Sequence, residues 1–283
     1  MEWRGRRQSG NIEDRRSVRG STKAGSVGGV GVIAVVIIGY FLGIDLTPLL
    51  NSGGMQTSSS APVEMTQADV SAGEFVSVVL ADTEVVWADL FQEQVRAAYN
   101  PVTLVLYKGV TASPCGSASG ATGPFYCPGD KKVYLDTDFF TTMEQQLGAG
   151  GDFAMAYVVA HEVAHHVQDE LGILSQANEV RGQVSEAESN SISVRIELQA
   201  DCLSGIWARE MQKTYGVIES GDFEEALNAA KQIGDDTLQR EAGRVPMPHT
   251  FTHGTSEQRQ RWFSTGLKSG LMSSCDTFAA RKL

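Results

Sequence analysis

The sequence contains few of the residues that define several protein classes. Its 283 residues include only four cysteines, eight prolines and five histidines. So few cysteines in so long a chain exclude a disulfide-dense mini-protein, and 42% hydrophobic residues exclude a fully disordered chain. Lysine and arginine (23) are outnumbered by aspartate and glutamate (34), which gives a net charge of −11. A chain this acidic has no general attraction for nucleic acid, so we expect no nucleic-acid partner.

Basic residues are absent from residues 24–95, whereas residues 1–23 contain seven basic and three acidic ones. Residues 24–44 (AGSVGGVGVIAVVIIGYFLGI) carry no charge at all. As a helix this run would measure about 31 Å, close to the hydrocarbon thickness of a bilayer. The run therefore predicts a single-pass membrane helix. Because the basic residues precede it, the positive-inside rule predicts a cytoplasmic N-terminus and an extracytoplasmic remainder, periplasmic or extracellular.

These patterns divide the chain into four parts. They are a basic cytoplasmic tail (1–23), a transmembrane helix (24–44), a linker with Pro, Gly and a Ser/Thr cluster (45–65) and one folded domain (66–283). A cleaved signal peptide is the alternative for the apolar run. The long basic region, and the lack of a small-residue cleavage site close behind the run, favour the membrane helix.

The four cysteines fit a location outside the cytoplasm, where disulfides persist. Cys115 and Cys127 flank a loop rich in Gly and Ser, which a disulfide would restrain. Cys202 and Cys275 are then left to pair with each other. Zinc-binding cysteines are the competing interpretation, and the absence of any CxxC pair disfavours it.

Periodicity within residues 66–283 predicts a helix-rich α+β fold with a small β-sheet. The expected strands are 103–107 and 132–136. The expected helices are 73–97, 138–148, 153–171, 185–212, 222–233 and one that begins near Ser256.

One of the expected helices contains the pattern His161-Glu162-Val163-Ala164-His165. Residues four apart share a helix face, so both imidazoles can bind one metal ion, while Glu162 can reach an attacking water as a general base. This is the HExxH pattern of zinc peptidases. Chance matches to so short a pattern occur. Apolar flanks predict that this helix is buried, however, where unpaired imidazoles are costly. His166 points off the shared face, and we expect it to be structural.

A catalytic zinc site needs a third protein ligand. Glu197 and Asp201 are again four apart on an expected helix, within the apolar stretch IELQADCLSGIWA. We expect Glu197 to complete a His2Glu site and Asp201 to accept a hydrogen bond from a ligand histidine. Three other acidic residues remain open as the third ligand: Glu186, Glu188 and Glu210.

A second pair of candidates lies near the C-terminal end, in the run THGTSEQR. His253, in a loop before a helix, could stabilise the negative charge that develops on a carbonyl oxygen during peptide hydrolysis. Arg259 or Arg261 could pair with the acidic groups of the site. The alternative is a loop histidine and a surface arginine without such roles.

Taken together, several segments resemble the "Putative neutral zinc metallopeptidase" family of bacterial membrane-anchored proteins. They are MEWRGRRQSGNIEDRR, CGSASGATGPFYCPGDKKVYLD, AHEVAHHVQ, RIELQADCLSGIWA and THGTSEQRQRWF. The resemblance implies a zincin-like fold that binds Zn²⁺. The last three segments also resemble the HExxH, ExxAD and TH-(x)5-R elements of M48-type peptidases, with Gly254 where those usually carry proline. That likeness implies that Glu197 is the third ligand and that Asp201 supports a ligand without binding the metal. It also implies that His253 and Arg259 belong to the active site.

The sequence therefore predicts a membrane-anchored zinc endopeptidase that cleaves extracytoplasmic proteins or peptides. We expect the strand at 132–136 to pair with an extended substrate. The alternative is a non-catalytic module in the cell envelope that uses zinc for stability and its cleft to bind a partner. The substrate and the oligomeric state do not follow from the sequence.

Overall fold

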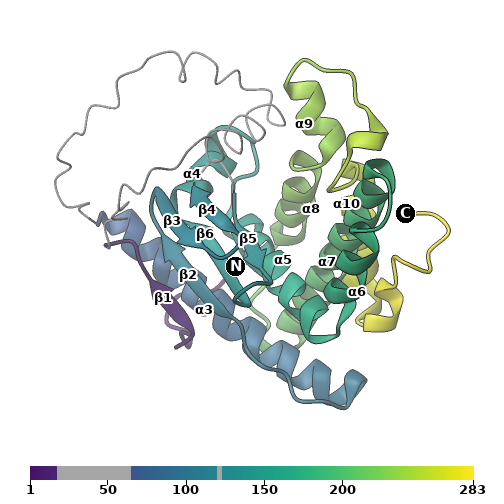
Figure 1. The fold of residues 1–283 in the computed structure, drawn as a ribbon. Helices are drawn as coiled ribbons and strands as arrows, with labels where there is room; N and C mark the ends of the chain where they lie inside the picture. Colours follow the sequence, from purple (N-terminus) through teal and green to yellow (C-terminus); the bar gives the residue numbers. More distant parts are fainter. Residues whose placement is uncertain (18–64, 120–122) are drawn as a thin grey trace, which may run out of the picture.

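The computed structural model describes residues 1–17, 65–119 and 123–283, in which helices pack around a small sheet (Figure 1). The helices are α3 (Gln67–Leu90), α4 (Asp138–Gln145), α5 (Asp152–Glu170), α6 (Ile173–Arg181), α7 (Glu186–Tyr215), α8 (Asp222–Gln232), α9 (Asp235–Glu241) and α10 (Ser256–Ser269). A π-helical turn (Phe91–Val95) follows α3, and 3-10 turns lie at Pro248–Thr250 and Met272–Cys275. The strands are β1 (Ile12–Asp14), β2 (Thr103–Tyr107), β3 (Val110–Ser113), β4 (Gly116–Ser119), β5 (Phe125–Cys127) and β6 (Lys132–Asp136). The predicted helix-rich α+β class is confirmed.

The main sheet has the strand order β1-β2-β6-β5. Strands β1, β2 and β6 run parallel, and β5 runs antiparallel to β6. Strands β3 and β4 form a separate antiparallel hairpin. The expectation that β6 pairs with a substrate is wrong, because β2 and β5 already occupy both of its edges. Within the described residues, β5 lies at the edge of this sheet.

The predicted membrane helix at 24–44 lies outside the described residues, as does the linker except for its last residue. Among the helices that the structure describes, none combines the length and the apolar character needed to cross a bilayer.

Residues 1–17, here called the N-terminal arm, pack against the folded domain rather than forming a separate tail. Strand β1 of the arm adds to the edge of β2 (Figure 1). Arg6 forms a two-pronged ion pair with Asp82 of α3, with nitrogen–oxygen distances of 2.8 and 2.9 Å. The arm thus contacts the domain that was predicted to begin at residue 66. Its arginines were interpreted as a topology signal, and in the structure acidic groups of the fold pair with them.

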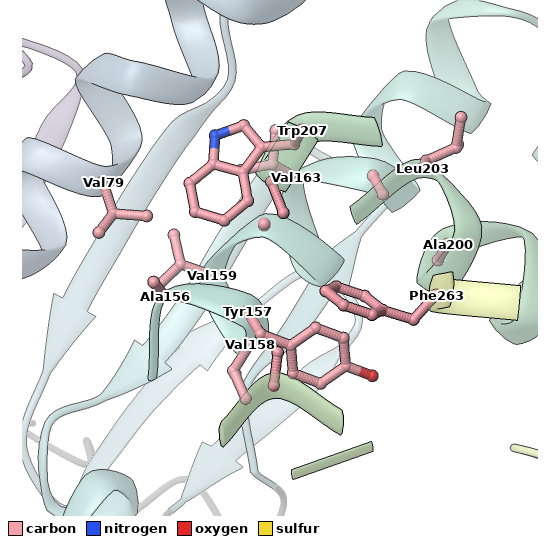
Figure 2. Packing of buried hydrophobic residues seen from close by; sticks show 14 of the residues in the cluster. Val79, Ala156, Tyr157, Val158, Val159, Val163, Ala200, Leu203, Trp207 and Phe263 are labelled. Carbon is pink, nitrogen blue, oxygen red and sulfur yellow. The ribbon is translucent and has the colours of Figure 1, made fainter. Parts of the chain in front are cut away.

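Helix α5 lies at the centre of the hydrophobic core. Figure 2 shows its apolar side chains between Val79 of α3, Trp207 of α7 and Phe263 of α10. Trp207 and Phe263 are fully buried. The apolar segment that precedes the His161 motif therefore fixes this helix between three others, which makes it a rigid support for a site.

Helices α7 and α10 approach each other closely through two glycines. A Cβ added at Gly266 would lie 1.8 Å from the carbonyl oxygen of Cys202, and one at Gly205 would lie 2.0 Å from that of Phe263. Any larger residue would force the helices apart. This close approach lets Arg259 of α10 reach across to α7.

Both predicted cysteine pairs form disulfides: Cys115–Cys127 and Cys202–Cys275. The first closes the loop that contains β4. The second ties the segment after α10 to the middle of α7, next to Asp201.

Candidate metal centre

Helices α5 and α7 bring together two histidines and one glutamate. His161 Nε2 lies 3.0 Å from Glu197 Oε2, and His165 Nε2 lies 3.5 Å from Glu197 Oε1. One ligand atom from each of the three residues lies within 4.8 Å of the others. Ligand atoms of tetrahedral zinc lie about 2.0 Å from the ion, and hence about 3.3 Å from one another. The two imidazoles and the carboxylate therefore fit a zinc ion in both chemistry and spacing.

The first histidine of the motif is held by a buried charged network. His161 Nδ1 donates to Asp201 Oδ1 at 2.9 Å, which leaves Nε2 to face Glu197. Asp201 is fully buried and also accepts from the hydroxyl of Tyr157 at 2.5 Å. Arg259 donates to both oxygens of Asp201, at 2.9 and 3.0 Å. Burial alone would raise the pKa of Asp201, but the charge of Arg259 and the contact with His161 hold it below its usual value.

The second histidine is held by a chain of neutral amides. His165 Nδ1 donates to Gln168 Oε1 at 2.9 Å. Gln168 is fully buried, and its amide nitrogen donates to the carbonyl oxygen of Ile196 at 2.8 Å and to Gln199 Oε1 at 2.9 Å. Gln199 in turn donates to the carbonyl oxygen of Cys275 at 3.0 Å. The ring of His165 is thus fixed to the main chain of α7 and to the disulfide-tethered C-terminal segment.

Glu162 lies beside the three ligands and is buried, with 8% of its surface exposed. Burial raises its pKa above the usual value, although the neighbouring His165 and His161 partly oppose the shift. A carboxylate with a raised pKa takes up a proton more readily than an exposed one, as a general base that later acts as an acid must. Glu197 shows the opposite behaviour. Burial favours its neutral form, but His165 and His161 hold its pKa well below 4.5, so it stays ionised as a metal ligand requires.

His253 lies in a loop that one carboxylate organises. Asp235, the first residue of α9, accepts hydrogen bonds from the backbone nitrogens of Thr252, His253 and Gly254, at 2.9, 2.6 and 2.9 Å. The side chain of His253 is half exposed, and its Nδ1 lies 3.3 Å from Asp235 Oδ1. Burial lowers the pKa of His253, but the contact with Asp235 and the charge of Glu197 raise it overall. Gly254 has a φ of +89°, which proline cannot adopt, so this loop differs in its backbone from the proline-containing one.

Arg259 does not reach the metal ligands directly. It is buried and holds Asp201, and one of its nitrogens lies 3.3 Å from the hydroxyl of Tyr157. Its position thus fits the predicted pairing with the acidic groups of the site, through Asp201.

His166, the third histidine of the motif region, has other partners. It is buried and bridges two segments. Its Nε2 lies 2.7 Å from the carbonyl oxygen of Asn100, and its Nδ1 lies 3.2 Å from the hydroxyl of Tyr126 on β5. Burial lowers its pKa, so the neutral form is favoured. Helix α5 is thereby joined to the edge strand.

The acidic residues left open as third ligands lie away from the two histidines. Glu188 caps the start of α7 with Ser185, and Glu210 pairs with Lys213 at 2.9 Å. Glu186 is exposed in the first turn of α7. The ligand-atom cluster that includes both motif histidines contains Glu197 instead.

Sequence reasoning missed three residues that build this site: Tyr157, Gln168 and Asp235. A signal for two of them was present. Tyr157, His161, His165 and Gln168 follow at intervals of four, four and three, which places them on one side of an otherwise apolar helix. Asp235 follows a glycine at the start of a short helix far from the motif along the chain, and nothing local marks its hydrogen bonds to the loop of His253.

The site is of a kind found in zinc-dependent hydrolases, with two histidines and a glutamate as ligands and a buried glutamate beside them. The comparison with known families agrees. The chain belongs to the family described as "Putative neutral zinc metallopeptidase", which matches residues 1–278.

Two relatives match most of the chain. The chain is 45% identical over 287 aligned positions to the "Uncharacterized protein YpfJ" of Escherichia coli K12, covering 98% of this chain and 99% of the relative. It is 38% identical over 260 positions to the "Uncharacterized protein Rv2575" of Mycobacterium tuberculosis H37Rv, covering 86% and 85%. No solved structure shows a significant match.

Proposed function

We propose that this protein is a zinc-dependent endopeptidase in which His161, His165 and Glu197 hold the metal. The observation that carries the proposal is the cluster of these three ligands beside the buried Glu162. Family membership supports the peptidase class. A zinc ion bound there would supply a Lewis acid that polarises a peptide carbonyl and acidifies water.

The protein's own groups then carry the proton transfers. Glu162 accepts the proton of the attacking water and passes it to the leaving nitrogen, and its raised pKa suits both steps. His253 donates a hydrogen bond to the carbonyl oxygen as negative charge develops there. Against the effect of burial, its pKa is raised above the usual value, mainly by the contact with Asp235, which favours the protonated ring that donates. Asp201 and Gln168 hold the two ligand rings in orientation.

We propose that an extended substrate pairs with β5. This strand lies at the sheet edge, and the contact of Tyr126 with His166 joins it to the helix that carries Glu162. Main-chain pairing would hold the substrate largely independently of its side chains, which suits proteins and peptides as a class.

We also propose that residues 24–44 attach the protein to a membrane and that its domain works outside the cytoplasm. The uncharged run supports the attachment. The two disulfides support an oxidising compartment.

The test is Glu162→Gln in the purified full-length protein. We expect one zinc per chain to be retained and cleavage of an unfolded protein substrate to fall by about 10²–10⁴-fold, since the proton acceptor is lost. Glu179→Gln, at an exposed position of α6, is the matched control and should retain full activity. A wild-type protein that binds one zinc and cleaves no substrate would favour the non-catalytic binding module instead.

A further inference from the structure

We infer that the face of α3 and the edge of β2 opposite β6 form a docking surface for the N-terminal arm, and that arm and domain lie on the same side of any membrane. Residues 24–44 would then hold the protein at a bilayer without carrying the arm across it. This inference does not depend on whether the site cleaves peptides.

The backbone of the arm is bonded to two elements of the domain. Strand β1 pairs in parallel with β2. The backbone nitrogen of Leu104 donates to Asn11, and that of Arg15 donates to Leu106, at 2.9 and 2.7 Å. Ser9 donates to the carbonyl oxygen of Ser77 on α3, at 3.0 Å. Without the arm, β2 would present an open edge of the kind that proteins usually protect.

The charges of the arm match those of α3. Arg6 meets both oxygens of Asp82, which is only 4% exposed. Glu84 accepts hydrogen bonds from Ser9, from Asn11 at 2.8 Å and from Arg7 at 3.1 Å. A buried ionised carboxylate is costly unless it is paired. The arginines of the arm supply these partners, since Arg6 pairs with Asp82 and Arg7 with Glu84. The arginines that suggested a cytoplasmic tail thus have a structural explanation.

The shapes also match. Gly73 of α3 makes room for the guanidinium of Arg16, because a Cβ there would lie 2.4 Å from its Nη2. The ring of Trp3 meets the buried ring of Phe75 edge to face, with centroids 5.5 Å apart. Both polar and apolar parts of the arm therefore have a complementary site.

The end of the arm meets the start of α3. Arg16 donates a hydrogen bond to the carbonyl oxygen of Asp69, in the first turn of α3. The chain therefore leaves the described structure after residue 17 and returns at residue 65 on the same face of the domain. A single crossing by residues 24–44 would place these two ends about 30 Å apart, on opposite sides of the hydrocarbon layer. Docking of the arm and a single crossing exclude each other within one molecule.

The test compares two single cysteines, Gln8→Cys in the arm and Ser175→Cys in α6, each introduced into the full chain. Both positions are exposed. The wild-type cysteines are disulfide-bonded, so the unaltered chain is the labelling blank. Intact cells are treated with a small membrane-impermeant maleimide, and a second sample is treated after permeabilisation.

Equal labelling of both cysteines in intact cells is the expected result. Labelling of both only after permeabilisation would also support the inference, but would overturn the proposed extracytoplasmic location. Labelling of Ser175→Cys in intact cells with Gln8→Cys protected would show the single crossing and overturn the inference. None of these outcomes depends on catalysis, so the proposed activity is tested separately.

A second measurement tests the docking itself in the purified full chain. Arg6→Glu should lower the thermal midpoint by roughly 5–10 °C, because it removes the guanidinium that pairs with the buried Asp82 and places a second carboxyl group beside it. Adding Asp82→Arg should recover most of that loss. Arg4→Glu makes the same charge change at an exposed position and is the matched control. Equal and small shifts for Arg6→Glu and Arg4→Glu would overturn the docking.

Discussion

The two histidines of the candidate metal centre lie side by side, with ring centroids 4.8 Å apart, yet their supports differ in kind. His161 is held by ionised groups, Asp201 with Arg259, contributed by α7 and α10. His165 is held by the neutral amide of Gln168, which ends on main-chain carbonyls. The ionised support joins three helices and depends on their mutual placement. The neutral support is local to α5, α7 and the C-terminal segment, and adds no charge beside the metal ligands.

The largest expected effect follows from breaking the ionised support. Asp201→Leu would leave the buried guanidinium of Arg259 without its carboxylate. Losing one partner of a buried pair costs about 3–5 kcal/mol of the free energy of unfolding. Urea unfolding of the metal-free protein measures this loss. The double variant Asp201→Leu with Arg259→Met, which removes both charges, should recover most of it. A loss below about 1 kcal/mol for Asp201→Leu would contradict a paired, buried network.

A smaller effect is expected from breaking the neutral support. Gln168→Leu removes the acceptor of His165 and leaves the carbonyl oxygen of Ile196 without this donor. Losing such a partner of a metal ligand lowers metal affinity by about 10–100-fold, and an unsatisfied buried group costs about 1–3 kcal/mol. Competition with a zinc chelator measures the affinity. Gln176→Leu, on the exposed face of α6, is the control. Unchanged zinc affinity in Gln168→Leu would show that the amide does not orient the ring.

The sequence was sufficient for features that depend on local spacing. The bounds of β2 and β6 were predicted as they stand, and the helix of the His161 motif was predicted to within one residue at each end. The i, i+4 spacing of Glu197 and Asp201 placed both on one face of an expected helix, and the structure brings that face to the motif.

Features that depend on contacts between distant segments were missed. The strands β1 and β5 are only three residues long and exist through pairing with β2 and β6. The contacts of the arm were missed because the partner of Arg6 lies 76 positions away. The spacing of Gln168 places it on the histidine side of α5, but its role depends on acceptors on another helix, which no local pattern specifies.

The smallest expected effect is the change in apparent zinc affinity for each pH unit. This pH dependence also distinguishes the ionised support from the neutral one most clearly. In the metal-free protein burial lowers the pKa of His161, but hydrogen bonds with Asp201 and Glu197 raise it to about 10. Because this pKa lies above the usual value of 6.5, the contribution of His161 to stability is complete below pH 6.5 and is lost as the pH rises through about 10. A ligand imidazole must be deprotonated, so zinc displaces this proton.

Apparent zinc affinity should therefore rise with pH by up to about tenfold per unit between pH 6.5 and 9. Chelator competition at several pH values measures the slope. Asp201→Asn should flatten it, because an amide does not stabilise the protonated ring as a carboxylate does. Gln168→Leu should lower the affinity at every pH and leave the slope unchanged, since a neutral group adds no charge to stabilise the proton. A slope that responds equally to both substitutions would mean that the ionised and neutral supports do not act separately on the two histidines.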